Sequence, residues 1–234
     1  MNILGIIPAR GGSRSIPRKN IVPLAGRPLL AYTCEAALRS KRLTRTILST
    51  DDEEIARVGA GCGVEVPFRR PADLAGDETP MIEVVRHALG WVMDHERYLA
   101  DIVVILQPTS PLRRAEHIDA AVDCLIETGA DSVVSVVAVP HQFSPASLMC
   151  LEEGRLVPLL DQPMVLRRQD KPRVYARNGP ATLVVRRELV SGGRLYGDMV
   201  LPLEMDPAAS VDIDDANDLA LAEFYLNRWT AAQP

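Results

Sequence analysis

The sequence has few aromatic residues, no excess of positive charge and no long apolar run, and each shortage excludes a class of protein. Aromatic side chains make up 4% of the 234 residues, so a stacking platform for single-stranded nucleic acid is not expected. The formal net charge is −5, from 26 Lys and Arg against 31 Asp and Glu, which argues against binding nucleic acid or an anionic membrane surface. No apolar run approaches the ~20 residues that cross a bilayer.

Cysteine and histidine are also sparse and lack metal-binding spacing. The sequence contains no C-x-x-C and no H-E-x-x-H, and its cysteines are widely separated at Cys34, Cys62, Cys124 and Cys150. A zinc site is therefore not expected, and the cysteines are typical of buried thiols in a reducing compartment. The first eight residues lack the features of a signal peptide. We expect a soluble, cytoplasmic protein.

Short apolar runs alternate with helical patterns along most of the chain. Strands are predicted at 3–7, 46–49, 64–66, 102–106, 132–139, 182–185 and 211–213, and helices at 28–40, 52–62, from Thr79-Pro80 onward, at 116–128 and at 215–228. This repetition predicts a three-layer, Rossmann-like α/β fold with a mostly parallel sheet. Residues 140–172 are rich in proline and break the pattern. We therefore expect an α/β core over 1–139, an inserted lobe over 140–172 and the rest of the core over 173–234.

The loop after the first strand carries the clearest chemical signal. Gly11 and Gly12 allow backbone N–H groups to approach an anion, and the loop holds four cations, Arg10, Arg14, Arg18 and Lys19. It matches neither the dinucleotide fingerprint nor the Walker A loop. Since ligands of open α/β sheets bind beyond the carboxyl ends of strands, the loop indicates a polyphosphate site; a solvated basic turn is the alternative.

Two further groups of polar residues follow predicted strands. Gln107, Thr109 and Ser110 lie after the strand at 102–106 and offer neutral hydrogen bonds suited to sugar hydroxyls, although they could simply form a rigid turn into the next helix. Asp212 and Asp214 face the same side of an extended segment and could share one Mg²⁺. The alternative is that Asp214 caps the last helix, a role that Asp215 can fill alone.

Five segments in order resemble the acylneuraminate (CMP-sialic acid) cytidylyltransferases: PARGGSRSIPRKN, LSTDD at 48–52, RRPADLAGDET at 69–79, LQPTSPLR at 106–113 and SVDIDDANDL at 210–219. The resemblance implies a fold of the nucleotide-sugar transferase type and the Mg²⁺-dependent transfer of CMP from CTP to a nine-carbon 2-keto acid, releasing pyrophosphate. It implies catalytic roles for Arg10, Lys19 and Asp214. It also implies a nucleotide pocket formed by Ala9, Arg10, Gly11, Gly12, Ser13, Arg14, Lys19, Asn20, Arg70, Asp77 and Thr79.

Simpler explanations remain open for three residues near this pocket. Arg70 could hydrogen-bond a cytosine carbonyl. Thr79 could be only the N-cap of the helix that it precedes, and Asp51 could cap the helix after its strand.

The acceptor's carboxylate calls for an arginine partner, and Arg168 and Arg177 are the candidates, with a surface ion pair as the alternative for each. The sugar-side set also includes Tyr175 and Asn178. The family's usual Y/F-R-P-N-G-A-I-Y segment is altered here to YARNGPAT, so its arginine is replaced by Ala176 and its aromatic by Thr182. A lysine that the family often carries has no match near 141–145. These changes favour a different sugar, such as legionaminic acid. The acidic Q-G-D-E-P of the related 3-deoxy-manno-octulosonate enzymes is absent.

Two alternatives to this activity remain: the same chemistry with another sugar acid or nucleotide, or a nucleotide-sugar-binding protein without turnover. The sequence identifies no general base. Because relatives are homodimers, the resemblance also implies that the inserted lobe is a dimerisation lobe.

Overall fold

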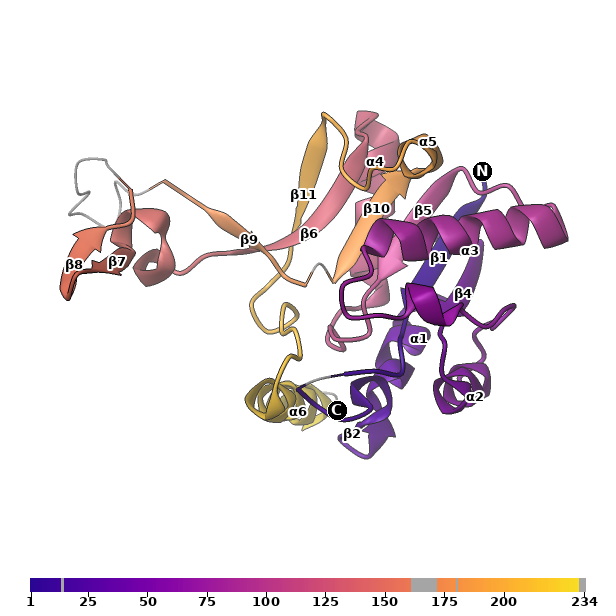
Figure 1. Cartoon of the computed structure of the whole chain (residues 1–234), viewed down its shortest axis with the longest axis horizontal. Coiled ribbons are helices and arrows are strands. Elements are labelled where there is room, and N and C mark those ends of the chain that lie inside the picture. The colour runs from indigo at the N-terminus through magenta and orange to yellow at the C-terminus, as the bar shows by residue number, and fades with distance from the viewer. Residues whose placement is uncertain (14, 161–171, 180, 232–234) are drawn as a thin grey trace.

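The computed structural model describes residues 1–13, 15–160, 172–179 and 181–231, and a seven-stranded sheet forms its centre (Figure 1). The order of hydrogen-bonded strands in the sheet is β11-β6-β10-β5-β1-β4, and β9 also pairs with β6. The strands are β1 (Ile3–Pro8), β4 (Arg45–Ser49), β5 (Ile102–Leu106), β6 (Ser132–Ala138), β9 (Tyr175–Arg177), β10 (Thr182–Arg186) and β11 (Val200–Glu204). β1 is parallel to β4 and β5, and β11 to β6, while β10 and β9 run antiparallel to their partners. The predicted α/β fold is confirmed.

Helices cover both faces of the sheet because its strands are apolar on both sides. In β1, Ile3 and Ile7 pack into one cluster, and Leu4 and Ile6 into the other. The first cluster includes residues of α1 (Leu29–Arg39), α2 (Glu53–Gly61) and α4 (Ala115–Thr128), and the second includes residues of α3 (Met81–Glu96) and α5 (Arg187–Ser191). This two-sided burial is typical of sheets wrapped by crossover helices.

The last helix, α6 (Ala216–Ala231), packs away from the sheet centre. It contacts the short hairpin of β2 (Pro23–Leu24) and β3 (Arg27–Pro28), and Ala222 joins a cluster with Leu24 and Leu29. Asp215 caps this helix by accepting hydrogen bonds from the backbone N–H groups of Asn217 (2.7 Å) and Asp218 (3.1 Å). The C-terminal helix thereby lies beside the segment that follows the loop after β1.

Two strand predictions are wrong, and two strands of the seven-stranded sheet were not predicted. Segment 64–66 makes only a single bridge, Ile47 to Glu65, and 211–213 is not a strand. β9 and β11 were not predicted. β11 contains Pro202, which argues against an interior strand, and its residues alternate between exposed and half-buried. Both features are tolerated because β11 pairs with β6 alone at the edge of the sheet.

The helix boundaries agree closely with the predictions, but the expected cap of α3 is wrong. Pro80 occupies the N-cap position, and no side chain caps the helix. Thr79 instead donates a weak hydrogen bond to the Asp73 carbonyl (3.4 Å). No helix of the described residues is long and apolar enough to cross a membrane.

Residues 140–160, here called the arm, leave the sheet and project away from it on β6 and β9 (Figure 1). The arm holds two 3-10 turns (His141–Phe143 and Pro145–Ser147) and a hairpin of β7 (Met149–Glu152) and β8 (Arg155–Pro158). Glu153 and Gly154 form its turn with φ of 48° and 79°, as a two-residue hairpin requires. Residues 161–171 of the expected lobe lie outside the described residues.

Candidate active site

A cleft of about 530 Å³ lies beyond the carboxyl ends of β1 and β5. Many of the predicted site residues line it: Arg10, Gly12, Ser13, Lys19, Asn20, Arg70, Asp77, Thr79, Gln107, Thr109 and Asp214. It also contains residues that the sequence did not single out as ligand-binding: Pro8, Ser15, Leu74, Gly76, Met81, Val84 and Pro108. The cleft therefore combines charged groups with an apolar wall from the start of α3.

Lys19 and Asp214 meet in this cleft although 195 positions separate them in sequence. The ammonium of Lys19 donates hydrogen bonds to the Ile213 carbonyl (2.9 Å) and to Asp214 Oδ1 (3.2 Å). The Lys19 side chain is 15% exposed and that of Asp214 is 81% exposed. Lys19 of the N-terminal loop and Asp214 of the C-terminal segment therefore share one cleft, whereas Asp212 is not among the described residues that line it.

Arg10 lines the same cleft as Lys19 and forms an ion pair with Asp77. Both side chains are 33% exposed, so each remains accessible from the cleft. A bound polyphosphate would compete with Asp77 for the Arg10 guanidinium.

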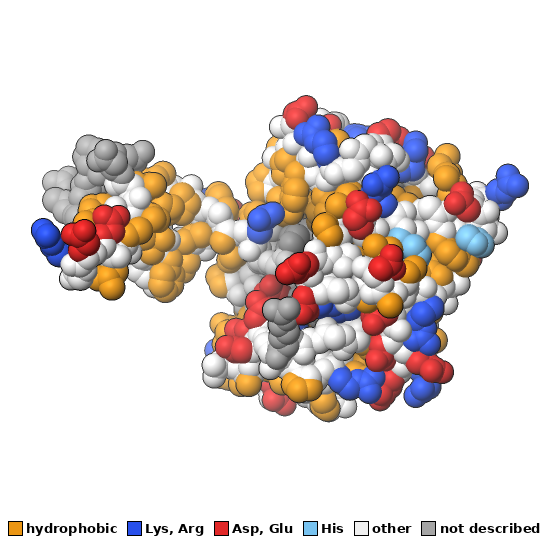
Figure 2. All heavy atoms as spheres, viewed as in Figure 1, with side chains coloured by type: hydrophobic (Ala, Val, Ile, Leu, Met, Phe, Trp, Pro, Cys, Tyr) orange, Lys and Arg blue, Asp and Glu red, His pale blue; other side chains and the backbone are white. Residues whose placement is uncertain are grey.

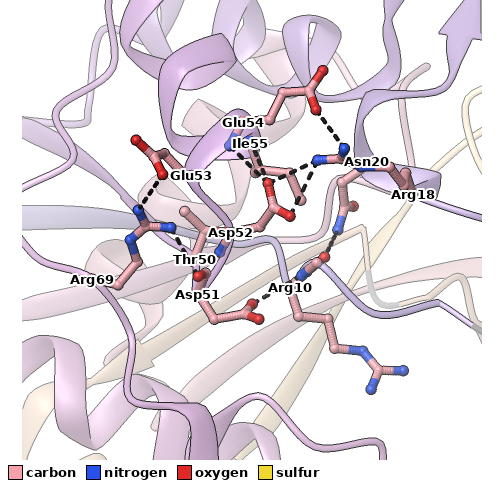
Figure 3. Close-up of polar contacts among 11 residues, drawn as sticks. Arg10, Arg18, Asn20, Thr50, Asp51, Asp52, Glu53, Glu54, Ile55 and Arg69 are labelled. Atoms are coloured by element: carbon pink, nitrogen blue, oxygen red, sulfur yellow. Dashed lines mark hydrogen bonds and ion pairs between the residues drawn. The ribbon is translucent and has the colours of Figure 1, made fainter.

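The loop after β1 is fastened to the β4–α2 turn (Figure 3). Asp51 accepts a hydrogen bond from the Gly11 backbone N–H (2.9 Å), and Asn20 donates one to the Arg10 carbonyl (2.8 Å). A Cβ added to Gly11 would lie 2.9 Å from the Cβ of Asp52, so a glycine is needed here. The predicted alternative that Asp51 caps α2 is wrong: Asp52 does so, accepting from the N–H groups of Glu54 and Ile55.

Arg70 is 4% exposed and holds the end of β4 in place. Its Nε donates to Ser49 Oγ (3.0 Å) and its Nη2 to the Ser49 carbonyl (2.5 Å). Burial lowers the pKa of Arg70 to about 10, and Arg70 is among the residues that line the cleft.

Asp212 and Asp214 offer the donors that a hard cation takes. Asp212 Oδ1 is buried and has no hydrogen-bond partner among the described residues. Burial raises the pKa of Asp212, a hydrogen bond with Thr109 opposes this change, and the charge of Asp214 adds to it. No group of three or more His, Cys, Asp or Glu side chains in the described part could hold a metal ion. Two carboxylates completed by phosphate oxygens fit Mg²⁺, so this pair suits a cation that arrives with the nucleotide.

Arg113 is a structural residue that the sequence did not single out, although it lies in the LQPTSPLR segment. It is 2% exposed, and its Nη1 donates to the carbonyls of Gln107 (3.1 Å) and Ala181 (2.8 Å). Burial lowers the pKa of Arg113 to about 9. The guanidinium joins the loop after β5 to the β9–β10 turn, and so fixes the position of Gln107.

The remaining sugar-side residues do not line this cleft. Tyr175 and Arg177 lie on β9 and donate hydrogen bonds to Glu204 and to the Tyr196 hydroxyl, respectively (both 3.1 Å). Asn178 is buried and donates to Ser210 Oγ (2.9 Å). Ser110 is buried too, and its Oγ has no partner among the described residues. Ala9 is buried and donates its N–H to the Ser49 carbonyl. Arg14 and Arg168 lie outside the described residues.

Solved structures share this fold. The chain is similar to a structure titled CMP:2-keto-3-deoxy-manno-octonic acid synthetase complexed with CTP, with a TM-score of 0.71, 16% identity, and coverage of 98% of this chain and 100% of that one. It is also similar to 4-diphosphocytidyl-2C-methyl-D-erythritol synthase from Anaerococcus prevotii, with a TM-score of 0.67, 15% identity, and coverage of 97% and 96%. At these identities the likeness shows the fold.

Relatives found by sequence have a higher identity to this chain than these solved structures. CMP-N,N'-diacetyllegionaminic acid synthase of Legionella pneumophila is 37% identical over 95% of each chain. Pseudaminic acid cytidylyltransferase of Campylobacter jejuni is 34% identical over 75% of each. N-acylneuraminate cytidylyltransferase of Escherichia coli is 33% identical over 94% of this chain, which spans 51% of that protein.

The fold and these relatives together define a nucleotidyltransferase. A family model described as Cytidylyltransferase matches residues 4–219. The chain belongs to the cytidylyltransferase family.

Proposed function

We propose that this chain catalyses the Mg²⁺-dependent transfer of CMP from CTP to the anomeric hydroxyl of a nine-carbon 2-keto-3-deoxy acid, with release of pyrophosphate. The observation that carries the proposal is the meeting of Lys19 and Asp214 in the cleft that Arg10 also lines. A relative named for diacetyllegionaminic acid, matched over nearly its whole length, supports legionaminic acid or a related nonulosonic acid as the acceptor.

The reaction needs positioning and charge neutralisation more than covalent chemistry. The acceptor hydroxyl forms a bond to the α-phosphorus of CTP, the bond to the bridging oxygen breaks, and pyrophosphate leaves. Arg10 and Lys19 would stabilise the triphosphate charge, and Asp212 and Asp214 would hold Mg²⁺. When bound, that ion neutralises phosphate charge and polarises the phosphorus. No histidine is among the described residues that line the cleft, so the proposal assigns the hydroxyl proton to water.

The neutral loop after β5 is proposed to bind the sugar. Gln107 and Thr109 line the cleft and can hydrogen-bond hydroxyl groups, while Arg113 holds the Gln107 carbonyl. Arg177 is the described candidate for the acceptor's carboxylate. It lies on β9 at the root of the arm, outside the cleft.

Pyrophosphate release tests this function. With CTP, Mg²⁺ and a panel of legionaminic, pseudaminic and N-acetylneuraminic acids, we expect release with at least one acid and a CMP-sugar product of matching mass. CTP binding without release for any acid would favour a binding protein, and release only with another nucleotide would replace CTP in the proposal.

We also propose that two copies assemble through the arm. The arm exposes Phe143 (60%), Leu151 (73%) and Leu156 (67%), and Figure 2 shows hydrophobic side chains gathered on it. A contiguous apolar surface of this kind is typical of an interface. We expect a sedimentation mass of two chains at micromolar protein, and the mass of one chain for a variant with Leu151→Glu and Leu156→Glu. A wild-type protein that sediments as one chain would contradict the assembly.

A further inference from the structure

Arg18 differs from the other described cations of the loop after β1 because it does not line the cleft. Its Nη2 pairs with Asp52 at 3.0 Å from Oδ1 and 3.2 Å from Oδ2, and its Nη1 pairs with Glu54 Oε2 at 2.5 Å. Figure 3 shows the guanidinium turned toward these two carboxylates at the start of α2. Both terminal nitrogens of the Arg18 guanidinium are therefore paired with acidic side chains of the protein itself.

Both carboxylates belong to the start of α2, and that of Asp52 is fixed by the helix itself. Asp52 caps the helix through the N–H groups of Glu54 (2.8 Å) and Ile55 (2.9 Å). The hydrogen bond from Ile55, and after it the charge of Arg18, lower the pKa of Asp52. Glu54 lies in the first turn of the same helix. Because acidic groups stabilise a helix N-terminus, this end of α2 already has its anions, and it offers Arg18 a rigid anchor.

The backbone of Arg18 is strained in a way that such an anchor can maintain. Its φ of 55° and ψ of 38° lie in the left-handed region, which is unfavourable for a residue other than glycine. The strained residue immediately precedes Lys19, whose ammonium reaches Asp214, and Asn20, whose amide holds the Arg10 carbonyl. The direction of the chain at Arg18 therefore sets where Lys19 and Arg10 lie.

We propose that Arg18 is a positioning residue that holds the loop after β1 against the N-terminus of α2 through its ion pairs with Asp52 and Glu54. We call these contacts the latch. Arg18 then serves substrate binding through Lys19 and Arg10 and makes no contact with phosphate. This inference rests on the proposed function for its substrate.

The latch and the alternative, in which Arg18 is itself a phosphate ligand, predict opposite changes in triphosphate affinity when an acidic partner is removed. If Arg18 bound phosphate, Glu54→Gln would free its guanidinium and remove a repulsive charge, so a triphosphate would bind more tightly. If Arg18 is a latch, Glu54→Gln loosens the loop, so a triphosphate binds more weakly, as it does in Arg18→Met.

Calorimetric titration of CTP, without acceptor, measures the Kd and so decides between the two predictions. We expect the Kd to rise about fivefold in Arg18→Met and about two- to threefold in Glu54→Gln, as for exposed ion pairs, with partial recovery in Arg18→Lys. Cytidine binding and the melting temperature should not change. The matched control is Glu53→Gln, since Glu53 neighbours Glu54, carries the same charge and, within the described part of the chain, pairs with Arg69 alone at 3.9 Å. The Kd of this control should match that of the wild type.

Tighter or unchanged CTP binding in Glu54→Gln, or unchanged binding in Arg18→Met, would overturn the latch. CTP binding by the wild type is measured first and tests the proposed function separately. If CTP does not bind, inorganic triphosphate reports on the same loop, and the same ratios of variant to wild-type Kd decide for or against the latch.

Discussion

Replacing Asp214 with alanine is expected to abolish nucleotidyl transfer at millimolar Mg²⁺ while leaving the fold intact. The Asp214 side chain is 81% exposed, and exposed substitutions usually change stability by no more than about 0.5 kcal/mol. Its loss leaves Asp212 as the single carboxylate for the metal, and Mg²⁺ is held in sites of this kind by one or two carboxylates and the substrate phosphates. Initial rates of pyrophosphate release and a thermal melt measure the two effects.

The matched control for this variant is Asp198→Ala. The Asp198 side chain is 93% exposed and pairs with Arg194, so this change removes the same charge outside the described cleft lining. We expect wild-type rates from the control. Near-normal turnover in Asp214→Ala would refute the metal assignment.

The second large effect is expected for Lys19→Met, which should lower kcat/KM by about a hundred- to a thousandfold, as does the loss of one donor to developing charge in other enzymes. The Lys19 side chain is 15% exposed and lines a cleft where its charge is poorly screened. Lys19→Arg should recover only part of the rate, since a planar fork replaces a point charge.

Steady-state rates and CTP titration are measured together for Lys19→Met, because the methionine also leaves the Ile213 carbonyl without its donor. That loss should cost about 1 kcal/mol of stability, which a denaturant melt detects separately. Retention of more than a tenth of the wild-type kcat/KM would show that Lys19 does not act on the triphosphate.

The sequence predicted the sheet and its helices well because these depend on local patterns. Ile3–Pro8 and Ile102–Leu106 are apolar on both faces, and Gly129 ends α4 with φ of 73°. The reversed direction of β10 could not be predicted, since direction depends on how the chain returns through the arm. β11 was missed because edge strands are half-exposed and tolerate Pro202.

The site shows where prediction from local sequence patterns fails. Asp51 and Asp52 are adjacent and chemically alike, so the sequence could not tell that Asp52 caps α2 while Asp51 holds Gly11. Arg18 was counted among the four cations of the loop that indicated a polyphosphate site, because its carboxylate partners lie more than thirty positions away. In contrast, the family resemblance assigned Lys19 and Asp214 to one reaction, and the structure brings both side chains to one cleft.

The position of a bound triphosphate tests the central claim most directly, that one nucleotide bridges the N-terminal cations and the C-terminal carboxylates. In a crystal structure of the wild-type protein with CTP and Mg²⁺, we expect a phosphate oxygen within hydrogen-bond distance of Lys19 Nζ and a metal ion bound to Asp214 and to the same triphosphate. A triphosphate bound away from Lys19, or a metal ion bound away from Asp214, would contradict the account.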